Sequence, residues 1–296
     1  MRSFPPPVSL RTSLILSLTA VLPFIPARPV QAHGDLDVRI AQLTDKLTAE
    51  PSNATLWLER ADVRRQHGEN AAAHSDADQA AGLRPDWAAP QLQLARIQFA
   101  QNLFSDAQIS AEAALRLEPD NADARVLRAR CLVRFARTND GIADLTHVLT
   151  GSATALPDLY LERAAWQAEG GDFAGAVKGL DEGIRKLGNT PSLALPAIEY
   201  ERQSGMFSAA LARLDSVKRY LPRTSAMLLR GEVLADAGRT LEARIAYETA
   251  LAELPPSEEQ QSNGTHHSEA LRTQLRQALQ RLEGNLHGQN AVKNSN

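Results

Sequence analysis

Cysteine is nearly absent from this sequence, because Cys131 is the only one among 296 residues. A lone cysteine has no partner within the chain, which excludes a disulfide framework. We therefore interpret Cys131 as a buried small apolar side chain rather than a redox group. Aromatic residues make up only 5% of the chain, whereas Ala, Leu, Arg, Glu and Gln dominate. This composition favours an all-helical protein over one built on a large sheet.

The motifs of common catalytic sites are missing as well. The sequence has no glycine-rich phosphate loop, no His-Glu-x-x-His, no Gly-x-Ser-x-Gly and no cysteine–histidine spacing suited to zinc. Paired helices also rarely supply the convergent loops that a catalytic site needs. We expect a protein that is not an enzyme and that carries no cofactor.

Long apolar runs are missing except near the N-terminus, where Arg2 and Arg11 precede an apolar stretch over residues 14–25. Residues 30–32, Val-Gln-Ala, follow with a pattern typical of a cleavage site, which predicts a cleaved signal peptide over residues 1–32. The alternative is an uncleaved anchor. Against it, the stretch is interrupted by prolines and is shorter than the roughly 20 residues that span a bilayer.

A strong charge of either sign is also missing, since the formal net charge is −3. Removing the leader takes away three of the 32 basic residues and no acid, which leaves 29 basic against 35 acidic side chains, or about −6. This balance disfavours a nucleic-acid partner. No cysteine follows the predicted cleavage point that could carry a lipid. We expect the mature chain, from His33 onward, to have no membrane span and to be periplasmic or secreted.

What the sequence does contain is a repeat. Pro51, Pro85 and Pro119 are spaced 34 residues apart, and each closes an apolar stretch that runs into a polar turn. This period is typical of a helix-turn-helix unit that buries its apolar face only by stacking on its neighbours, with proline marking a helix end. Six such units are visible over residues 54–256. The connection over residues 151–156 is longer than the others, and we expect it to be the weakest joint.

Small residues recur at fixed places in the unit. Alanine recurs at two positions where the backbones of two antiparallel helices can cross closely. One set is Ala61, Ala95, Ala129 and Ala164, and the other is Ala73, Ala107, Ala176, Ala210 and Ala243. Glycine recurs in the turn, where it permits a positive backbone φ angle, at Gly68, Gly171, Gly205 and Gly238.

At these residues the chain resembles the tetratricopeptide repeat family. The resemblance covers residues 54–256 and implies an all-α fold, a superhelical solenoid of about six such repeats with a capping helix at each end. We place the capping helices at 33–53 and 266–284, a polar loop at 257–265 and a disordered tail at 285–296. Most aromatic residues of the family are missing, and arginine replaces a leucine at Arg60, Arg128, Arg163 and Arg230. We expect these departures to loosen the packing, particularly in the third repeat.

The resemblance also implies that the chain holds a protein or peptide, with the first helix of each pair lining an inner groove. Basic residues gather on these helices in units one to three, and acidic residues (Glu169, Glu199, Glu232 and Asp236) in units four to six. Arginine binds a carboxylate through two parallel hydrogen bonds, and apolar neighbours bury peptide side chains. We therefore predict that an extended, carboxylate-bearing segment binds at Arg65, Arg96, Phe99, Arg130 and Arg134. The alternative is that these charges pair with neighbouring side chains and keep the surface soluble.

The resemblance to exported members of the family implies an adaptor protein. We expect this adaptor to serve envelope assembly, secretion or maturation. The family's carboxylate clamp uses asparagine and lysine residues that this chain lacks, so binding of chaperone tails is disfavoured. A copper-handling protein is the alternative function, since cleavage after Ala32 would expose His33 as an N-terminal metal ligand. Self-association through a terminal repeat also stays open. We interpret His67, His74 and His147 as incidental.

Overall fold

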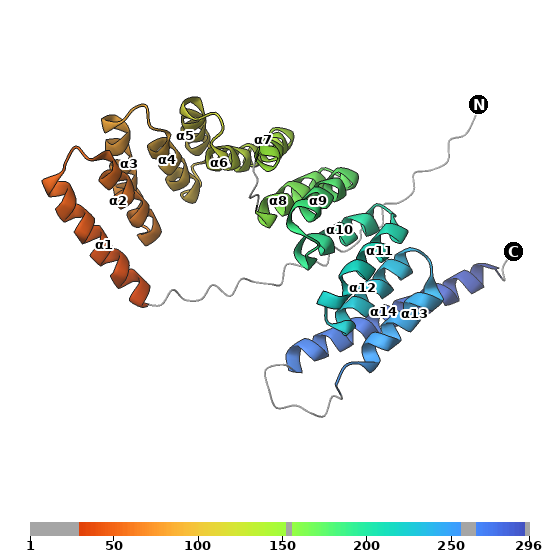
Figure 1. Ribbon diagram of the computed structural model, residues 1–296. Helices are drawn as coiled ribbons and strands as arrows, with labels where there is room; N and C mark the ends of the chain where they lie inside the picture. Colours follow the sequence, from red (N-terminus) through yellow and green to blue (C-terminus); the bar gives the residue numbers. More distant parts are fainter. Residues whose placement is uncertain (1–29, 152–155, 256–264, 294–296) are drawn as a thin grey trace, which may run out of the picture. The chain divides into compact units, whose positions relative to one another are not determined.

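The computed structural model describes residues 30–151, 156–255 and 265–293, and these are almost entirely helical, without a strand (Figure 1). The predicted all-α repeat fold is confirmed. The chain divides into two compact units, and the boundary between them along the sequence lies between Leu103 and Phe104. None of the described helices is both long enough and apolar enough to cross a bilayer. Nearly all of the predicted leader and polar loop, and most of the predicted long connection, lie outside the described residues.

The first unit contains a short series of helices, each packed on the next. They are α1 (Val30–Ala49), α2 (Ala54–His67), α3 (Asn70–Leu83) and α4 (Ala88–Ala100). Besides these sequential contacts, α2 lies against α4, so the first helices of successive repeats are neighbours. α1 begins three residues before the predicted start of the capping helix and covers one side of α2.

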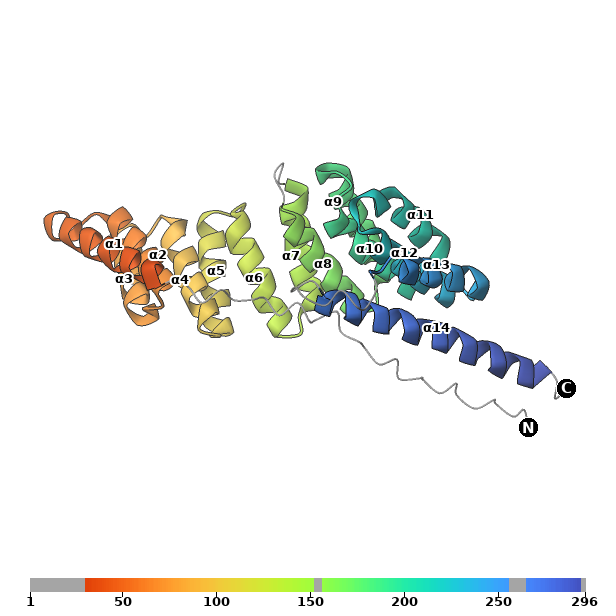
Figure 2. The ribbon, with the colours of Figure 1, turned by 90° about the horizontal axis from the view of Figure 1, so that it is seen from below.

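The second unit continues the pattern from α5 to α14. Its helices are α5 (Phe104–Leu117), α6 (Ala122–Arg134), α7 (Thr138–Gly151), α8 (Pro157–Glu169), α9 (Phe173–Leu187), α10 (Pro191–Gln203), α11 (Phe207–Val217), α12 (Arg223–Asp236), α13 (Thr240–Ala252) and α14 (Thr265–Lys293). A 3-10 turn, Lys218–Tyr220, follows α11. α8 also contacts α10, and α14 packs on α13 (Figure 2). α14 continues beyond residue 284, where the sequence places its end, because glycine inside a helix costs only about 1 kcal/mol.

The boundary between the units falls inside the second predicted repeat, since α4 belongs to the first unit and α5 to the second. The repeat frame itself is regular at this point. α2, α4 and α6 begin at Ala54, Ala88 and Ala122, which keeps the 34-residue period of the prolines.

Polar side chains hold the turns that precede the first helices. Asn53 accepts hydrogen bonds from the backbone N–H groups of Thr55 and Leu56, which caps the N-terminus of α2. The indole of Trp57 then reaches back to the carbonyl oxygen of Pro51 at 2.8 Å. Arg125 makes the equivalent bond to the carbonyl of Pro119, at 2.5 Å, from the same place in α6. The repeating prolines thus end one unit and also anchor the next one.

The glycines predicted in the turns have the expected backbone conformation. Their φ angles are positive, between 72° and 93°, at Gly68, Gly171, Gly205 and Gly238. The prediction from glycine is therefore confirmed at all of them. In the second and third repeats the same conformation is adopted by Asn102 (φ 62°) and Ala136 (φ 58°), where a side chain makes it less favourable.

The two sets of small residues lie where the helices cross, as predicted. Every alanine of both sets is at most 1% exposed. Gly141 of α7, which stands where the second set has alanine, allows an even closer approach. A β-carbon added there would lie 2.9 Å from the carbonyl oxygen of Ala129. Small residues thus let the backbones of α6 and α7 approach closely.

Two of the arginines that replace the family's leucine, Arg60 and Arg128, are each held by a carboxylate of the next helix. Nε and Nη2 of Arg60 on α2 donate to the two carboxylate oxygens of Asp76 on α3, each at 2.8 Å. Arg128 on α6 binds Asp144 on α7 in the same way, at 2.6 and 2.7 Å. These two guanidinium groups are therefore bound rather than loose, although a pocket lies beside Arg128 in the third repeat. A carboxylate 16 residues later receives each guanidinium, so the polar pair takes the place of an apolar contact.

Candidate functional site

The predicted binding residues lie on the first helices of the repeats. We call the surface of α2 and α4 the N-terminal first-helix surface, and the surface of α6, α8, α10 and α12 the C-terminal first-helix surface. They belong to different units and are described separately. Within each, polar side chains bridge successive first helices, as Gln93 of α4 does to Asp62 of α2.

On the N-terminal first-helix surface, Arg65 has an acidic partner. Its Nη2 donates to Asp62 at 2.9 Å, and Asp62 also accepts hydrogen bonds from Gln66 and Gln93. Burial alone raises the pKa of Asp62, but these bonds and the charge of Arg65 outweigh it and hold the pKa below its ordinary value. Arg96 and Phe99 lie on α4, and both are partly buried.

On the C-terminal first-helix surface, Arg130 of α6 forms a bidentate ion pair with Glu162 of α8. Nε and Nη2 each lie 2.9 Å from one of the two carboxylate oxygens. The hydrogen bond to Glu162 raises the pKa of Arg130. Arg134 is exposed at the end of α6, with its guanidinium 5.1 Å from the centroid of the Phe104 ring. A carboxylate-bearing ligand would therefore compete with Glu162 at Arg130, while Arg134 presents a more open cation.

Three of the four acidic positions predicted on this surface come together around one arginine. Arg202 of α10 donates two hydrogen bonds to Glu199, at 2.8 and 2.9 Å, and one to Asp236 of α12. Glu232 of α12 receives only a long hydrogen bond, 3.4 Å, from Gln274 of α14. Burial raises the pKa of Glu232, the nearby charge of Arg202 opposes this shift, and the carboxylates of Glu199 and Asp236 add to it. This acidic cluster thus has more carboxylates than cations.

Sequence reasoning missed the contribution of α14 to this cluster. The sequence gives no reason to connect Gln274 with these acids, because α14 lies outside the repeat frame. The fourth predicted acid, Glu169 of α8, acts on the neighbouring side chain of Tyr200. Burial of Tyr200 raises its pKa, and the charges of Glu169 and Glu199 raise it further.

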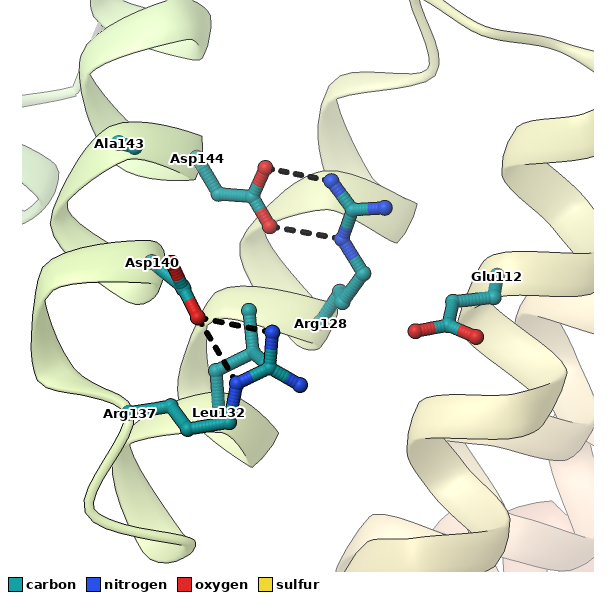
Figure 3. A pocket seen from close by; sticks show the side chains of 7 residues that line it. All are labelled: Glu112, Arg128, Leu132, Arg137, Asp140, Ala143 and Asp144. Atoms are coloured by element: carbon teal, nitrogen blue, oxygen red, sulfur yellow. Dashed lines mark hydrogen bonds and ion pairs between the residues drawn. The ribbon is translucent and has the colours of Figure 1, made fainter.

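Sequence reasoning also missed a pocket of about 300 Å³ between α5, α6 and α7 (Figure 3). Its lining is Glu112, Arg128, Leu132, Arg137, Asp140, Ala143 and Asp144. Both guanidinium groups in it are bound by acids of the protein, Arg128 by Asp144 and Arg137 by Asp140. Glu112 faces Arg128 across the opening. The only sequence signal for this arrangement is the 16-residue arginine–aspartate spacing, which Arg60 and Asp76 share.

The remaining candidates concern metal and redox chemistry. The side chain of His33 lies outside the described part of the chain, although its position is in α1. His67, which sequence reasoning set aside, lies between the carboxylates of Asp37 and Glu69. Cys131 is buried, and burial raises the pKa of its thiol to about 11. Such a thiol is almost fully protonated at neutral pH, which agrees with a packing role.

Comparisons with known proteins bear on the fold. A family profile described as tetratricopeptide repeat matches residues 92–142 and 196–258. No curated protein matches the sequence significantly. The C-terminal part of a tetratricopeptide repeat protein from Cytophaga hutchinsonii is similar in structure, with a TM-score of 0.60 at 12% identity, covering 80% of this chain and 95% of that one.

Two further solved structures are similar over most of their length. A tetratricopeptide repeat protein from Parabacteroides merdae aligns with a TM-score of 0.50 at 15% identity, over 83% of this chain and 94% of that one. The pilF protein of Pseudomonas aeruginosa aligns with the same score at 16% identity, over 73% and 96%. At these identities the likeness concerns the fold. The chain thus has the fold of these tetratricopeptide repeat proteins, its helix pairs follow the 34-residue frame, and the family profile matches two parts of it.

Proposed function

We propose that this chain is an exported adaptor that holds an extended peptide or protein segment on its first-helix surfaces. Its fold is that of a protein–protein interaction scaffold. The observation that carries the finer proposal is the bidentate binding of Glu162 by Arg130, because it places a carboxylate on one of the predicted arginines. A glutamate or aspartate of a partner has the same chemical group as Glu162.

The predicted arginines, Arg65 and Arg96 in the first unit and Arg130 and Arg134 in the second, which we call the arginine strip of each unit, are suited to an acidic segment. Arg65 and Arg130 each bind a carboxylate of this chain that is itself partly exposed, Asp62 at 41% and Glu162 at 23% of the side chain. Such exposed pairs contribute at most about 1 kcal/mol, so a partner carboxylate can replace the internal one at small cost. Arg96, Phe99 and Arg134 extend the strip within their own units with further cationic and aromatic surface.

Export is the second part of the proposal, and it rests on the sequence. The leader pattern over residues 1–32 and the absence of a lipid-attachment cysteine after it support a periplasmic or secreted adaptor. Such an adaptor would serve envelope assembly, secretion or maturation. Cell fractionation with an antibody against the chain, together with N-terminal sequencing of the mature protein, tests this part. Recovery of uncleaved chain from the cytoplasm contradicts it.

Affinity capture tests the binding surface. The tagged mature chain, residues 33–296, is incubated with envelope extract from its own source beside an Arg96→Glu/Arg130→Glu variant, and bound proteins are identified by mass spectrometry. We expect a protein that the wild type retains and the variant loses, because reversed charges repel a carboxylate. Circular dichroism checks that the variant keeps its helices, since the carboxylate introduced at position 130 would face Glu162.

A matched variant controls for the change in net charge. Arg239→Glu/Arg244→Glu introduces the same charge reversal at the start of α13 and within it, where both arginines are about half exposed and pair with acids of the same helix. We expect this variant to retain the partner. Loss of the partner in both variants would mean that net charge governs capture, and retention in both would move the binding surface away from the arginine strip.

A further inference from the structure

Three metal-ligating side chains meet where α1 lies against the C-terminal end of α2. Nε2 of His67 is 3.4 Å from a carboxylate oxygen of Asp37, and Nδ1 of His67 is 2.9 Å from a carboxylate oxygen of Glu69. One donor atom from each of the three residues lies within 4.8 Å of the other two. We propose that Asp37, His67 and Glu69 form a binding site for a divalent metal ion of the zinc class.

The local fold fixes the three backbones. α2 ends at Gly68, whose φ angle of 93° reverses the chain, and its N–H bonds to carbonyls of the last turn of α2. The N–H of Glu69 then bonds to the carbonyl of Arg64 at 2.8 Å, which brings Glu69 back beside His67. Asp37 arrives from α1 through the packing of α1 on α2. Asp37 and Glu69 contact opposite ring nitrogens of His67, so an ion bound at Nε2 beside Asp37 requires the Glu69 carboxylate to rotate from Nδ1 toward the ion, within the 4.8 Å that separates the donor atoms.

The donor set selects the kind of ion. An imidazole nitrogen with two carboxylates suits zinc, whereas magnesium and calcium prefer oxygen donors alone. Two ligands on a tetrahedral zinc ion, each about 2.0–2.2 Å from it, lie about 3.3–3.6 Å apart. The separation of 3.4 Å between His67 and Asp37 falls in this range. Asp37 is 62% exposed, so water can reach the fourth position.

The competing explanation is that a protonated His67 simply forms two ion pairs that hold α1 on α2. Arg64 belongs to the same group, since its Nε lies 3.6 Å from the second carboxylate oxygen of Glu69. Its charge orients Glu69 but also lowers the local preference for a cation. Direct metal binding separates the two explanations, because an ion pair requires the proton that a bound metal displaces.

Zinc titration of the chain, purified as the cell processes it and without a histidine tag, tests the site. Isothermal calorimetry on chelator-treated protein should show one zinc equivalent, and hydrogen exchange should slow in α1 and α2 when zinc is added. We expect at least about tenfold weaker binding in each of Asp37→Asn, His67→Ala and Glu69→Gln. Circular dichroism checks that each variant is folded. If His67→Ala does not fold, the folded Glu69→Gln variant still tests the site.

His74 provides a matched control. Its Nδ1 lies 3.0 Å from Asp78 one turn later on α3, so it is a histidine–carboxylate pair of the same kind outside the proposed cluster. His74→Ala should bind zinc as tightly as the wild type, and so should His33→Ala. The proposal is overturned if the wild type takes up no zinc, if His67→Ala binds as tightly as the wild type, or if His74→Ala loses as much affinity as His67→Ala.

Discussion

The helix pairs α2–α3 and α10–α11 each have an ion pair between their two helices, but the acid and the base are exchanged. In the first pair, Arg64 of α2 binds Asp76 of α3 at 2.7 Å. In the second, Glu201 of α10 binds Arg213 of α11 at 2.6 and 3.0 Å. Both partners are 12 residues apart, and both pairs stand at the same distance from the start of their first helix, Ala54 or Pro191. The two pairs therefore occupy equivalent positions with the signs exchanged.

This difference shows that an ion pair at these two positions can be built with either sign, the acid lying on the second helix or on the first. The acid is buried in both cases, since the side chains of Asp76 and Glu201 are 2% and 3% exposed. A buried carboxylate is costly unless a cation and hydrogen bonds compensate it. Each ion pair therefore has a third charged partner. Asp76 also binds Arg60, and Arg213 also binds Asp181 at 2.7 Å.

Removing the acid from the first pair should have the largest effect. Asp76→Ala leaves the guanidinium groups of Arg60 and Arg64 without the carboxylate that both bind, and we expect a loss of about 3–5 kcal/mol. Urea unfolding followed by circular dichroism measures the loss, and hydrogen exchange should locate it in α2 and α3. Asp78→Ala, on the same helix but 56% exposed, should change stability by less than about 0.5 kcal/mol. Equal effects of the two substitutions would contradict a role for burial.

Exchanging the signs of the second pair sharpens the comparison. Glu201→Arg and Arg213→Glu should each cost about 3 kcal/mol, because each places two like charges at the crossing. The double variant should recover at least about 1 kcal/mol relative to the sum of the single losses. Asp181 prevents full recovery, since it would then face the carboxylate introduced at position 213. Additive losses in a double-mutant cycle would show that the two positions do not interact.

The sequence predicts the frame of this molecule better than its polar contacts. The proline period, the crossing alanines and the turn glycines locate the helix pairs because each reports on local backbone geometry. The ion pairs between the two helices of a repeat are not predicted by the same reasoning. Arg60 only departs from the family pattern, and its partner Asp76, 16 residues later, is identified by the structure. Gln274 is not predicted either, because α14 lies outside the repeat period. The boundary between α4 and α5 has no signal in composition, because the repeat frame continues across it.

The pair α12–α13 places an aromatic ring at its crossing and should respond more weakly. Tyr247 of α13 lies over Gly231 of α12, where an added β-carbon would be 2.3 Å from the ring. Gly231→Ala should therefore cost about 1–2 kcal/mol, because overpacking outweighs the better helix propensity of alanine. Gly82→Ala in α3, where nothing lies within 4 Å, should instead gain about 0.5–1 kcal/mol. Thermal unfolding of both variants distinguishes crowding from helix propensity.

Glu232 gives the smallest expected effect and completes the comparison with Glu201. Both are glutamates on first helices, but Glu201 has the guanidinium of Arg213, whereas Glu232 receives a 3.4 Å bond from an amide. Burial holds the pKa of Glu232 above its ordinary value. The folded state therefore keeps this proton to a higher pH than the unfolded chain does, and stability falls as the pH rises from the unfolded pKa through the folded one. Glu232→Gln should remove this loss, so that the variant gains stability relative to the wild type as the pH rises from about 4 to about 7, as urea unfolding at several pH values would show. A stability difference between variant and wild type that is independent of pH would mean that Glu232 ionises as freely in the folded chain as in the unfolded one.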